Sequence, residues 1–264
     1  MFVLSKGKST GKIVNSLNDN GVIISAAHYP VEECRQGSHY HENPHICFLF
    51  QGGDIESRND RSYERKTGDV FFYYSGEEHA SISRSRLSKN INIEFGKTFL
   101  EKYGFSESQI EKAVKNNLDA KFLILKMQQE ILINDNSSQV TIQTLLLNLI
   151  NHSKNSAYES DPKWVQLLSD LLNDKWNEQL TLDELSNATG KYPTTISKYF
   201  RKYFSCTLGE YLRKLKIDKS IPLIKNSQMS LTEIALRCGF ADQSHFIRNF
   251  KQLTGFLPKE FRNI

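Results

Sequence analysis

Cysteine is scarce in this sequence of 264 residues, and no two of its four cysteines are spaced as a CxxC pair. They stand at Cys34, Cys47, Cys206 and Cys238. Cysteines in this number and spacing are typical of reduced thiols in a cytosol. Cys34 and Cys47 lie near several histidines, but the commoner role of such cysteines is a buried, unreactive thiol rather than a redox or zinc site.

Long apolar runs are also absent, since no run approaches the roughly 18 residues that a membrane-spanning helix needs. The first residues, MFVLSKGKSTGK, lack the apolar core of a secretory signal. These two absences predict an intracellular, cytoplasmic protein with no membrane partner. Apolar residues make up 39 % of the chain and charged residues 24 %, which is typical of a globular protein, and the length suits two ordinary domains.

Acidic residues are sparse in the last part of the chain. Residues 163–264 hold 16 Lys/Arg against 10 Asp/Glu, giving +6, whereas residues 1–162 hold 18 against 20, giving −2. Within residues 191–225 there are nine basic residues and only two acidic ones. Concentrated positive charge attracts polyanions such as DNA, although a basic face can also simply keep a protein in solution.

Three kinds of pattern follow one another along the chain. Up to about residue 96, β-branched and aromatic runs between glycine-containing turns predict strands: GVIISAAHY, HICFLFQGG, GDVFFYYSG and NINIEFG. From about residue 99 to 153, apolar residues at three-to-four spacing predict helices, as in AKFLILKMQQEILI and VTIQTLLLNLINHS. The polar stretch SKNSAYESDP then predicts a linker, and everything from residue 163 onward predicts helices joined by short turns.

The helical C-terminal part contains an internal repeat. Two capping boxes, Thr181-Leu-Asp-Glu184 and Ser230-Leu-Thr-Glu233, predict matching helix starts 49 residues apart. A glycine follows each predicted helix, Gly190 in one copy and Gly239 in the other, and permits the positive φ of a tight turn. A second amphipathic helix comes next in each copy, so the repeat predicts two helix-turn-helix units.

The second helix of each unit has an aromatic face and a hydrogen-bonding face. The predicted core faces are Ile196, Phe200 and Tyr203 in one unit and Phe246, Phe250 and Leu253 in the other. Any surface helix is polar on its outer side, but two matched copies with basic outer faces favour DNA binding, because Arg, Lys and Gln pair with base edges and phosphates. We therefore predict DNA contacts from the outer and flanking residues: Thr194, Ser197, Lys198, Arg201, Lys202, Gln243, Ser244, His245, Arg248 and Lys251.

Residues 163–263 resemble the DNA-binding domain of the AraC/XylS family of bacterial transcription regulators. The resemblance lies in LDELSNATG…ISKYFRKYF, in EYLRKLKIDKSIPLI and most specifically in SLTEIALRCGFADQSHFIRNFKQLTGFLPKEFR. It implies seven helices in two subdomains joined by a rigid helix, with both recognition helices in successive major grooves roughly 34 Å apart. By position, it implies base contacts from Thr194, Ser197, Lys198, Gln243, Ser244, His245 and Arg248.

Three positions depart from the family pattern. Thr207-Leu208 stands where the family has Thr-Pro or Ser-Pro, and Lys216 stands where arginine is common. Pro222 falls inside the expected connecting helix, where a missing N–H and a ring clash cost about 3 kcal/mol. We therefore expect a kink or an early helix end near Pro222.

Two N-terminal stretches, GSHYHENPHICFLFQGG and GDVFFYYSGEEH, resemble the two halves of a cupin barrel, which is the ligand sensor of many AraC-type regulators. His39 and His41 share one strand face because side chains alternate along a strand, and His79 is expected at a strand end facing them. Imidazoles in such a cluster can bind a transition metal. Metal-binding cupins, however, supply a glutamate a few residues after the paired histidines, where this chain has His45.

The missing glutamate favours a pocket that binds a small effector over a metal site, and we predict no metal and no other cofactor. The predicted pocket residues are His39, His41, His45, Phe48, Phe72, Tyr74 and His79. Side-chain directions in residues 45–50 and 70–74 stay open, because both runs are apolar on both faces. Two alternatives also stay open: histidines that are satisfied in the core or rim of the barrel, and a cupin metalloenzyme with an accessory DNA-binding domain.

Together these patterns predict an α+β multidomain protein. It comprises a cupin-like β-barrel at 1–98, a helical dimerisation region at 99–155, a linker at 156–162 and an all-α DNA-binding domain at 163–264, with two helix-turn-helix subdomains joined by a linker helix. Apolar stripes in the helical region pack on their own domain or, in regulators of this kind, form a dimer contact; they contain Phe122, Leu125, Ile131, Leu145, Leu146, Leu149 and Ile150.

We predict a homodimeric transcription regulator that is not an enzyme and that binds double-stranded DNA and a small effector of unknown identity. The family resemblance implies an activator more often than a repressor and makes RNA polymerase a further candidate partner. A regulator whose barrel only dimerises is a third alternative.

Overall fold

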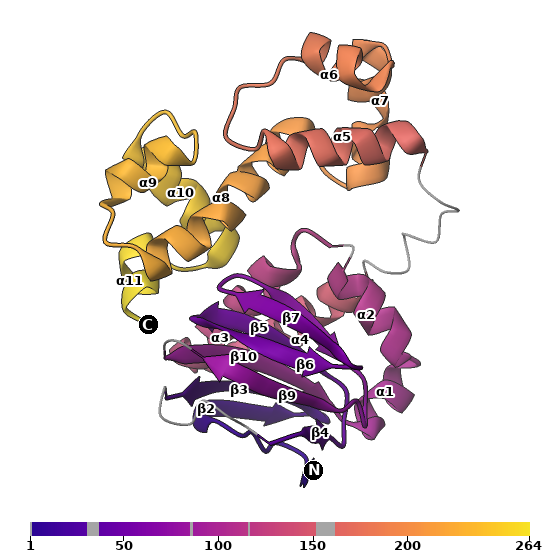
Figure 1. The fold of residues 1–264 in the computed structure, drawn as a ribbon, viewed down its shortest axis with the longest axis vertical. Coiled ribbons are helices and arrows are strands. Elements are labelled where there is room, and N and C mark those ends of the chain that lie inside the picture. The colour runs from indigo at the N-terminus through magenta and orange to yellow at the C-terminus, as the bar shows by residue number, and fades with distance from the viewer. Residues whose placement is uncertain (1, 31–36, 85–86, 116, 152–161) are drawn as a thin grey trace. The chain divides into compact units, whose positions relative to one another are not determined.

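The structure is a computed structural model that describes residues 2–30, 37–84, 87–115, 117–151 and 162–264 (Figure 1). The chain divides into two compact units, Met1–Ser156 and Ala157–Ile264. Of the linker predicted at 156–162, only Pro162 is among the described residues, and it precedes the first helix of the second unit. Within the described ranges, no helix combines the length and the apolar character that crossing a membrane requires.

The first unit contains two five-stranded sheets, with the orders β1-β4-β9-β6-β7 and β2-β3-β10-β5-β8. Every pairing between the described strands lies within one sheet, so strand pairing does not close the expected barrel. The strands are β1 (Phe2–Leu4), β2 (Lys12–Asp19), β3 (Val22–Tyr29), β4 (His39–His41), β5 (His45–Gln51), β6 (Gly53–Arg58), β7 (Arg61–Lys66), β8 (Val70–Tyr73), β9 (His79–Arg84) and β10 (Ser88–Phe95).

The β2-β3-β10-β5-β8 sheet has an apolar centre. β10 pairs antiparallel with both β3 and β5, so Ile93 lies opposite Ile24 on one side and Ile46 on the other. All three side chains are at most 1 % exposed. Strands covered on both faces are continuous apolar runs, which is why the sequence predicts β3, β5, β8 and β10.

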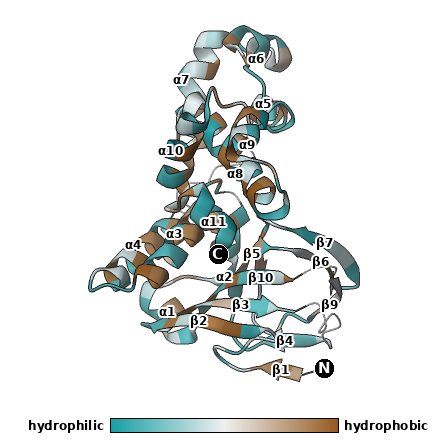
Figure 2. Cartoon of the chain, turned by 90° about the vertical axis from the view of Figure 1, so that its left-hand side faces the viewer, coloured by the Kyte–Doolittle hydropathy of each residue, from teal (hydrophilic) through white to brown (hydrophobic). Residues whose placement is uncertain are grey.

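The other sheet carries charged residues on its inner face. Asp54 and Glu56 on β6 and Arg65 on β7 are at most 6 % exposed, whereas Ile55 between the two acids is 42 % exposed. Figure 2 shows the contrast, since β7 is strongly hydrophilic while the strands of the apolar sheet carry hydrophobic stretches. Because side chains alternate along a strand, this sheet turns its polar residues into the unit and gives it a hydrophilic interior.

Four helices follow the strands in the first unit (Figure 1): α1 (Lys97–Tyr103), α2 (Glu107–Lys115), α3 (Ala120–Ile133) and α4 (Ser138–Asn151). α3 packs against α4 and β2, and α2 packs against α4 and β8. Most of the apolar stripe predicted for a dimer contact is buried within this unit, namely Phe122, Leu125, Leu146, Leu149 and Ile150. Ile131 and Leu145 are half-buried. The stripe therefore contributes mainly to the core of its own unit.

The second unit consists of seven helices within residues 162–264: α5 (Lys163–Asp174), α6 (Leu182–Thr189), α7 (Pro193–Phe204), α8 (Leu208–Asn226), α9 (Leu231–Arg237), α10 (Gln243–Thr254) and α11 (Pro258–Asn263). The two predicted capping boxes are confirmed at the starts of α6 and α9, where Thr181 and Ser230 are the cap residues. Gly190 and Gly239 have φ values of +65° and +69°, as the turns after these helices require.

The helix α8 connects the two copies of the repeat. It does not end at Pro222, since residues 223–226 continue the helix. Ile217, Ile221 and Ile224 are fully buried along it, and their burial offsets the hydrogen bond that the proline cannot donate. Lys216, at the position where the family commonly has arginine, donates from Nζ to the carbonyl oxygen of Gly239 at 2.8 Å and so ties α8 to the turn of the second copy.

Candidate functional site

In the first copy of the repeat, α7 turns a basic and polar face outward. Pro193 occupies the first helical position, where its fixed φ suits a helix start. Ile196 and Phe200 point inward and are at most 2 % exposed. The predicted DNA-contacting residues of this helix are all exposed, namely Thr194, Ser197, Lys198, Arg201 and Lys202.

In the second copy, α10 repeats this arrangement. Asp242 caps the helix by accepting a hydrogen bond from the backbone N–H of His245 at 2.7 Å, and Phe246 and Phe250 are fully buried. The outward positions Ser244, Arg248 and Lys251 are exposed. Both helices therefore have an aromatic inner face and a hydrogen-bonding outer face within the same unit of the chain.

Neighbouring residues hold two of the predicted contact residues of α10. The side-chain carbonyl oxygen of Gln243 accepts a hydrogen bond from the hydroxyl of Thr232 at 2.6 Å, which leaves its amide nitrogen as a donor. The His245 ring packs edge-on against Phe240, with ring centroids 5.3 Å apart. Both side chains are half-buried. Since their directions are already fixed, less conformational entropy is lost when they meet a base edge.

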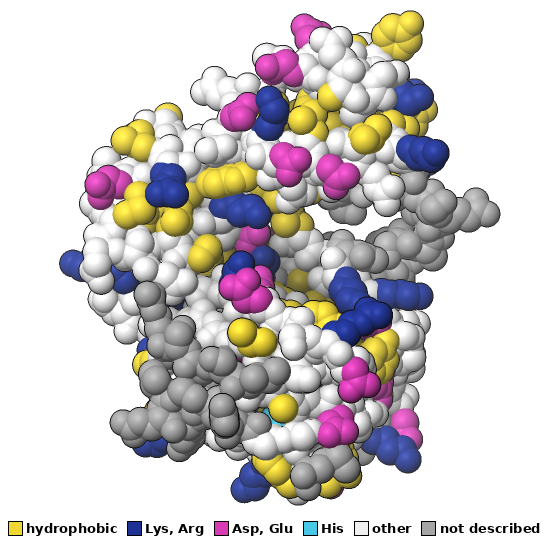
Figure 3. Space-filling view, viewed as in Figure 1, with side chains coloured by type: hydrophobic (Ala, Val, Ile, Leu, Met, Phe, Trp, Pro, Cys, Tyr) yellow, Lys and Arg dark blue, Asp and Glu magenta, His cyan; other side chains and the backbone are white. Residues whose placement is uncertain are grey.

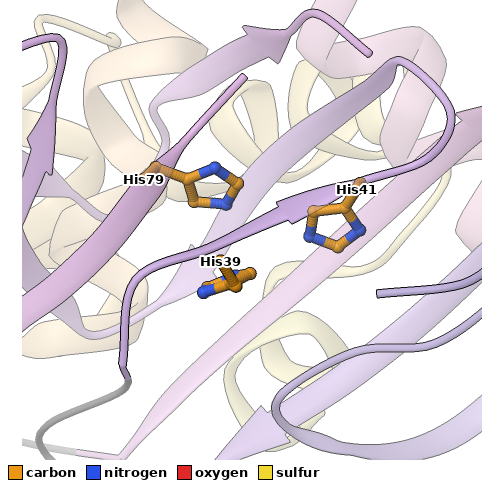
Figure 4. A group of neighbouring side chains, drawn as sticks. All are labelled: His39, His41 and His79. Carbon is orange, nitrogen blue, oxygen red and sulfur yellow. The ribbon is translucent and has the colours of Figure 1, made fainter. Parts of the chain in front are cut away.

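A cluster of histidines lies in the hydrophilic interior of the first unit (Figure 4). His39 and His41 come from β4, and His79 comes from the adjacent β9, directly opposite His39. The ring centroids of His39 and His79 are 4.4 Å apart, and that of His41 lies 5.6 and 5.5 Å from them. One ring nitrogen of each lies within 4.8 Å of those of the other two. His45, from β5 of the apolar sheet, adds a fourth ring 4.2 Å from His41.

These histidines are withdrawn from solvent. His39, His45 and His79 are at most 7 % exposed, and histidine contributes almost no visible surface to the face shown in Figure 3. Burial lowers the pKa of His41 to about 4 and that of His79 to about 3, and it also lowers the pKa values of His39 and His45. The four imidazoles are therefore neutral at pH 7.

Backbone carbonyls select the tautomers of two of these rings. The Nδ1 atom of His39 lies 3.0 Å from the carbonyl oxygen of Gly37, and the Nδ1 atom of His79 lies 3.0 Å from that of Glu77. A carbonyl oxygen only accepts hydrogen bonds, so each Nδ1 carries the proton and each Nε2 keeps its lone pair.

A buried ion cluster lies beside the histidines. The Arg65 guanidinium binds Asp54 through Nε at 2.6 Å and Glu56 through Nη1 at 2.6 Å. The Tyr73 hydroxyl accepts from Arg65 at 2.7 Å and donates to Glu56 at 2.8 Å. The Tyr73 ring lies 4.6 Å from both His45 and His79. This network fixes the wall of the histidine cluster and satisfies charges that would otherwise be costly to bury.

The four histidines line one pocket with Glu56, Arg65 and Tyr73 of the ion cluster, and its cavity volume is about 40 Å³. Polar side chains of β10 also line it, namely Asn90 and Asn92. A buried water needs about 10–15 Å³ measured in this way, so the pocket has room for a few water-sized groups.

Among solved structures, that of ToxT from Vibrio cholerae aligns with 92 % of this chain and 98 % of its own, at 13 % identity and a TM-score of 0.39. In sequence, residues 185–264 match the model of a helix-turn-helix domain family. The HTH-type transcriptional activator RhaR of Mannheimia succiniciproducens is 23 % identical over 240 residues, which cover 85 % of this chain and 86 % of that relative. RhaR of Cronobacter sakazakii is 22 % identical over 258 residues, 91 % of this chain and 90 % of its own.

These matches support the resemblance of the chain to the AraC/XylS family of DNA-binding transcription regulators. Four of the predicted pocket residues line the polar pocket of the first unit: His39, His41, His45 and His79.

The other three predicted pocket residues do not line this pocket. On β8, Tyr73 faces the histidines, so the alternation of side chains sends Phe72 and Tyr74 the other way. The Tyr74 hydroxyl donates to Glu111 on α2 at 2.6 Å. On β5, His45 and Cys47 line the pocket and Phe48 points away from it, fully buried. The sequence could not show these side-chain directions, because residues 45–50 and 70–74 are apolar on both faces of their strands.

Sequence reasoning missed the polar wall of this regulator's pocket. Asp54, Glu56 and Arg65 stand on strands that the apolar patterns do not indicate, and Tyr73 sits within an aromatic run. The signal that could have found them is the charge alternation in GDIESR and RSYERK, which places acidic and basic residues at strand spacing. Cys34, which the sequence places near the histidines, lies outside the described residues.

Proposed function

We propose that this chain is a sequence-specific transcription activator whose DNA binding is modulated by a ligand in its N-terminal unit. In this proposal α6–α7 and α9–α10 are two helix-turn-helix units, and α7 and α10 are the recognition helices that enter successive major grooves of double-stranded DNA. The relatives named as activators support the sign of regulation. RNA polymerase is then a proposed partner.

The observation that carries the proposal is the matched exposure of α7 and α10. Both helices have 12 residues, and each buries two large side chains four residues apart while its polar side faces solvent. We assign base contacts to residues near the helix starts, because the N-terminal part of a recognition helix lies deepest in the groove. These are Thr194, Ser197, Lys198, Gln243, Ser244, His245 and Arg248.

We assign phosphate contacts to the cations nearer the helix ends: Arg201, Lys202 and Lys251. Such contacts position a protein on the duplex without reading its sequence.

For the N-terminal half, we propose a cupin-like sensor at 1–98 and a helical region at 99–155 that contributes to a homodimer. Three exposed apolar residues near the α3–α4 turn are candidates for this contact: Leu132, Ile133 and Val140. The linker at 156–162 then joins this half to the DNA-binding domain at 163–264. Because such a regulator acts on chromosomal DNA, we also propose a cytoplasmic location.

The proposal is tested by selecting bound sequences from a random DNA pool with the full-length protein and measuring affinities for the selected site. Arg248→Ala should relax discrimination at one base pair by about 1–3 kcal/mol, because arginine pairs with guanine in two hydrogen bonds. Lys251→Ala should weaken binding to all sequences similarly and reduce the salt dependence by about one phosphate contact.

Lys97→Ala is the matched control, because it removes the same positive charge from an 85 % exposed side chain on α1 of the first unit. It should leave both affinity and specificity unchanged. Equal losses on specific and random DNA for Arg248→Ala and Lys251→Ala would contradict the assignment of base and phosphate contacts. A pool that yields no enriched sequence would contradict the proposed function itself.

A further inference from the structure

We propose that His39, His41 and His79 bind one divalent transition-metal ion of the Zn²⁺, Co²⁺ and Ni²⁺ class, and that this ion is the ligand sensed by the N-terminal unit. The sequence argues against a metal because His45 stands where metal-binding cupins supply a glutamate a few residues after the paired histidines. The structure supplies three nitrogen ligands without that glutamate, since β9 brings His79 to the two histidines of β4.

The spacing of the three rings fits a single ion. Their ligand nitrogens lie within 4.8 Å of one another, so there is a point within about 2.8 Å of all three. Metal–imidazole bonds are about 2.0–2.1 Å long, so each ring has to move by only about 0.7 Å to close the site. Figure 4 shows the three rings around a common space between β4 and β9.

The hydrogen bonds behind the rings are those that a metal site needs. Gly37 and Glu77 hold the Nδ1 protons of His39 and His79 and thereby fix both rings with Nε2 as the ligand atom. Such backbone partners orient metal-binding histidines and raise their basicity. The His41 ring contacts other histidine rings but makes no hydrogen bond within the described residues, so it is available as the third ligand.

Charge and space around the rings also favour an ion. The neighbouring cluster joins one guanidinium, Arg65, to two carboxylates, Asp54 and Glu56, so it has no excess positive charge to repel a cation. The cavity of about 40 Å³ has room for an ion and one or two waters. Three protein ligands leave at least one coordination position open for such a water or a small anion.

A bound ion would join two strands that are weakly connected. β4 has three residues, and His39 with His79 is its one Cα pair with β9 in the described strands. Coordination by both strands would hold β4 against β9 and stabilise the first unit. The step from this local change to DNA affinity rests on the proposed function, whereas metal binding itself does not.

The first experiment measures metal binding by the full-length protein without a His tag. Chelator-treated protein is titrated with Co²⁺ and with Zn²⁺, and bound metal is counted by elemental analysis after dialysis. We expect one ion per chain and, with Co²⁺, visible absorption bands of a site with nitrogen ligands. Less than about 0.2 ion per chain, or the absorption of hydrated Co²⁺ alone, would overturn the proposal.

Variants locate the site. His41→Gln and His79→Gln each remove one ligand with a similar side-chain volume, and each should lower metal affinity at least about 100-fold, since even loss of an outer partner costs 10–100-fold. His28→Gln is the matched control, because His28 lies on β3 of the same unit outside the pocket. Equal metal affinities for all three variants would overturn the assignment of the ligands. Thermal unfolding of each variant without metal checks that it is folded.

Binding to the DNA site selected above is then compared with and without the metal. A metal-dependent change in affinity of tenfold or more, lost in His41→Gln, supports the ion as the effector. Stoichiometric metal binding with unchanged DNA affinity would overturn the effector role and leave the metal site standing. Absence of specific DNA binding in both states would instead count against the proposed function.

Discussion

Replacing Gly239 with alanine should destabilise the C-terminal unit much more than the same change at Gly190. The two glycines occupy equivalent positions in the repeat and have nearly the same φ, +69° and +65°. Their surroundings differ. A Cβ atom on residue 239 would lie 2.6 Å from the carbonyl oxygen of Asn177 and 3.1 Å from Nζ of Lys216, whereas one on residue 190 would meet no atom within 4 Å.

The magnitudes follow from these two environments. A left-handed backbone costs a non-glycine residue about 1–2 kcal/mol, and the smaller entropy of the unfolded alanine chain returns about 0.4–1 kcal/mol. Gly190→Ala should therefore lower the free energy of unfolding by about 1 kcal/mol. Gly239→Ala adds a contact that a fixed backbone carbonyl cannot avoid by rotation, and overpacking of this kind costs about 1–3 kcal/mol more.

The two tryptophans of the chain make the measurement specific. Trp164 and Trp176 both lie in the unit that spans residues 157–264, so tryptophan fluorescence follows the unfolding of this unit within the full-length protein. In urea titrations the two variants should have similar slopes of unfolding free energy against urea concentration. Gly239→Ala should unfold at the lower urea midpoint, because it also has the packing cost of the close contact. In thermal unfolding, each kcal/mol corresponds to about 4 °C for a unit of this size.

Equal losses in the two variants would refute the close approach of the second turn to the loop after α5. No loss in either variant would refute the left-handed conformation of both turns.

Two further predictions concern local stability. Thr181→Ala and Ser230→Ala should each destabilise the C-terminal unit by about 1 kcal/mol, because each removes the side-chain oxygen that accepts a hydrogen bond from the N–H of the third helical residue. Tryptophan fluorescence in a urea titration measures this loss, and unchanged urea midpoints would contradict it. Acidification of the metal-free protein from pH 7 to pH 5 should destabilise the first unit. In the unfolded chain His41 binds a proton below about pH 6.5, whereas in the folded protein it does so only near its pKa of about 4. This difference lowers the free energy of unfolding by about 2 kcal/mol at pH 5. Calorimetry follows this transition, and an equal midpoint at both pH values would contradict neutral burial of the histidines.

The C-terminal half could be predicted largely from sequence because its signals are local. The capping boxes lie within four residues, and the faces of α7 and α10 follow from the helical period alone. Ile196, Phe200, Phe246 and Phe250 are accordingly in the core, at most 2 % exposed. The course of α8 through Pro222 was harder to predict, because burial on one helix face outweighs the local effect of the proline.

The N-terminal half was predicted only in part, and the two sheets explain why. The apolar runs that the sequence indicates as strands belong to the apolar sheet, and their residues look buried whichever way they point. In the other sheet, Asp54, Glu56 and Arg65 are buried because each finds its partner across strands. Such pairing depends on which strands become neighbours, and a charged stretch on its own looks solvent-exposed.

The amino-acid sequence by itself determined the helical repeat, its caps and glycines, and the shared face of His39 and His41, because each depends only on residues a few positions apart. The tertiary structure decided which residues meet from a distance. It placed His79 opposite His39 through the pairing of β9 with β4, and it turned Tyr73 rather than Phe72 or Tyr74 toward the histidines. The physical reason is that strand order and register are set by the packing of the whole unit, whereas helix caps and helix faces are set by the chain next to them.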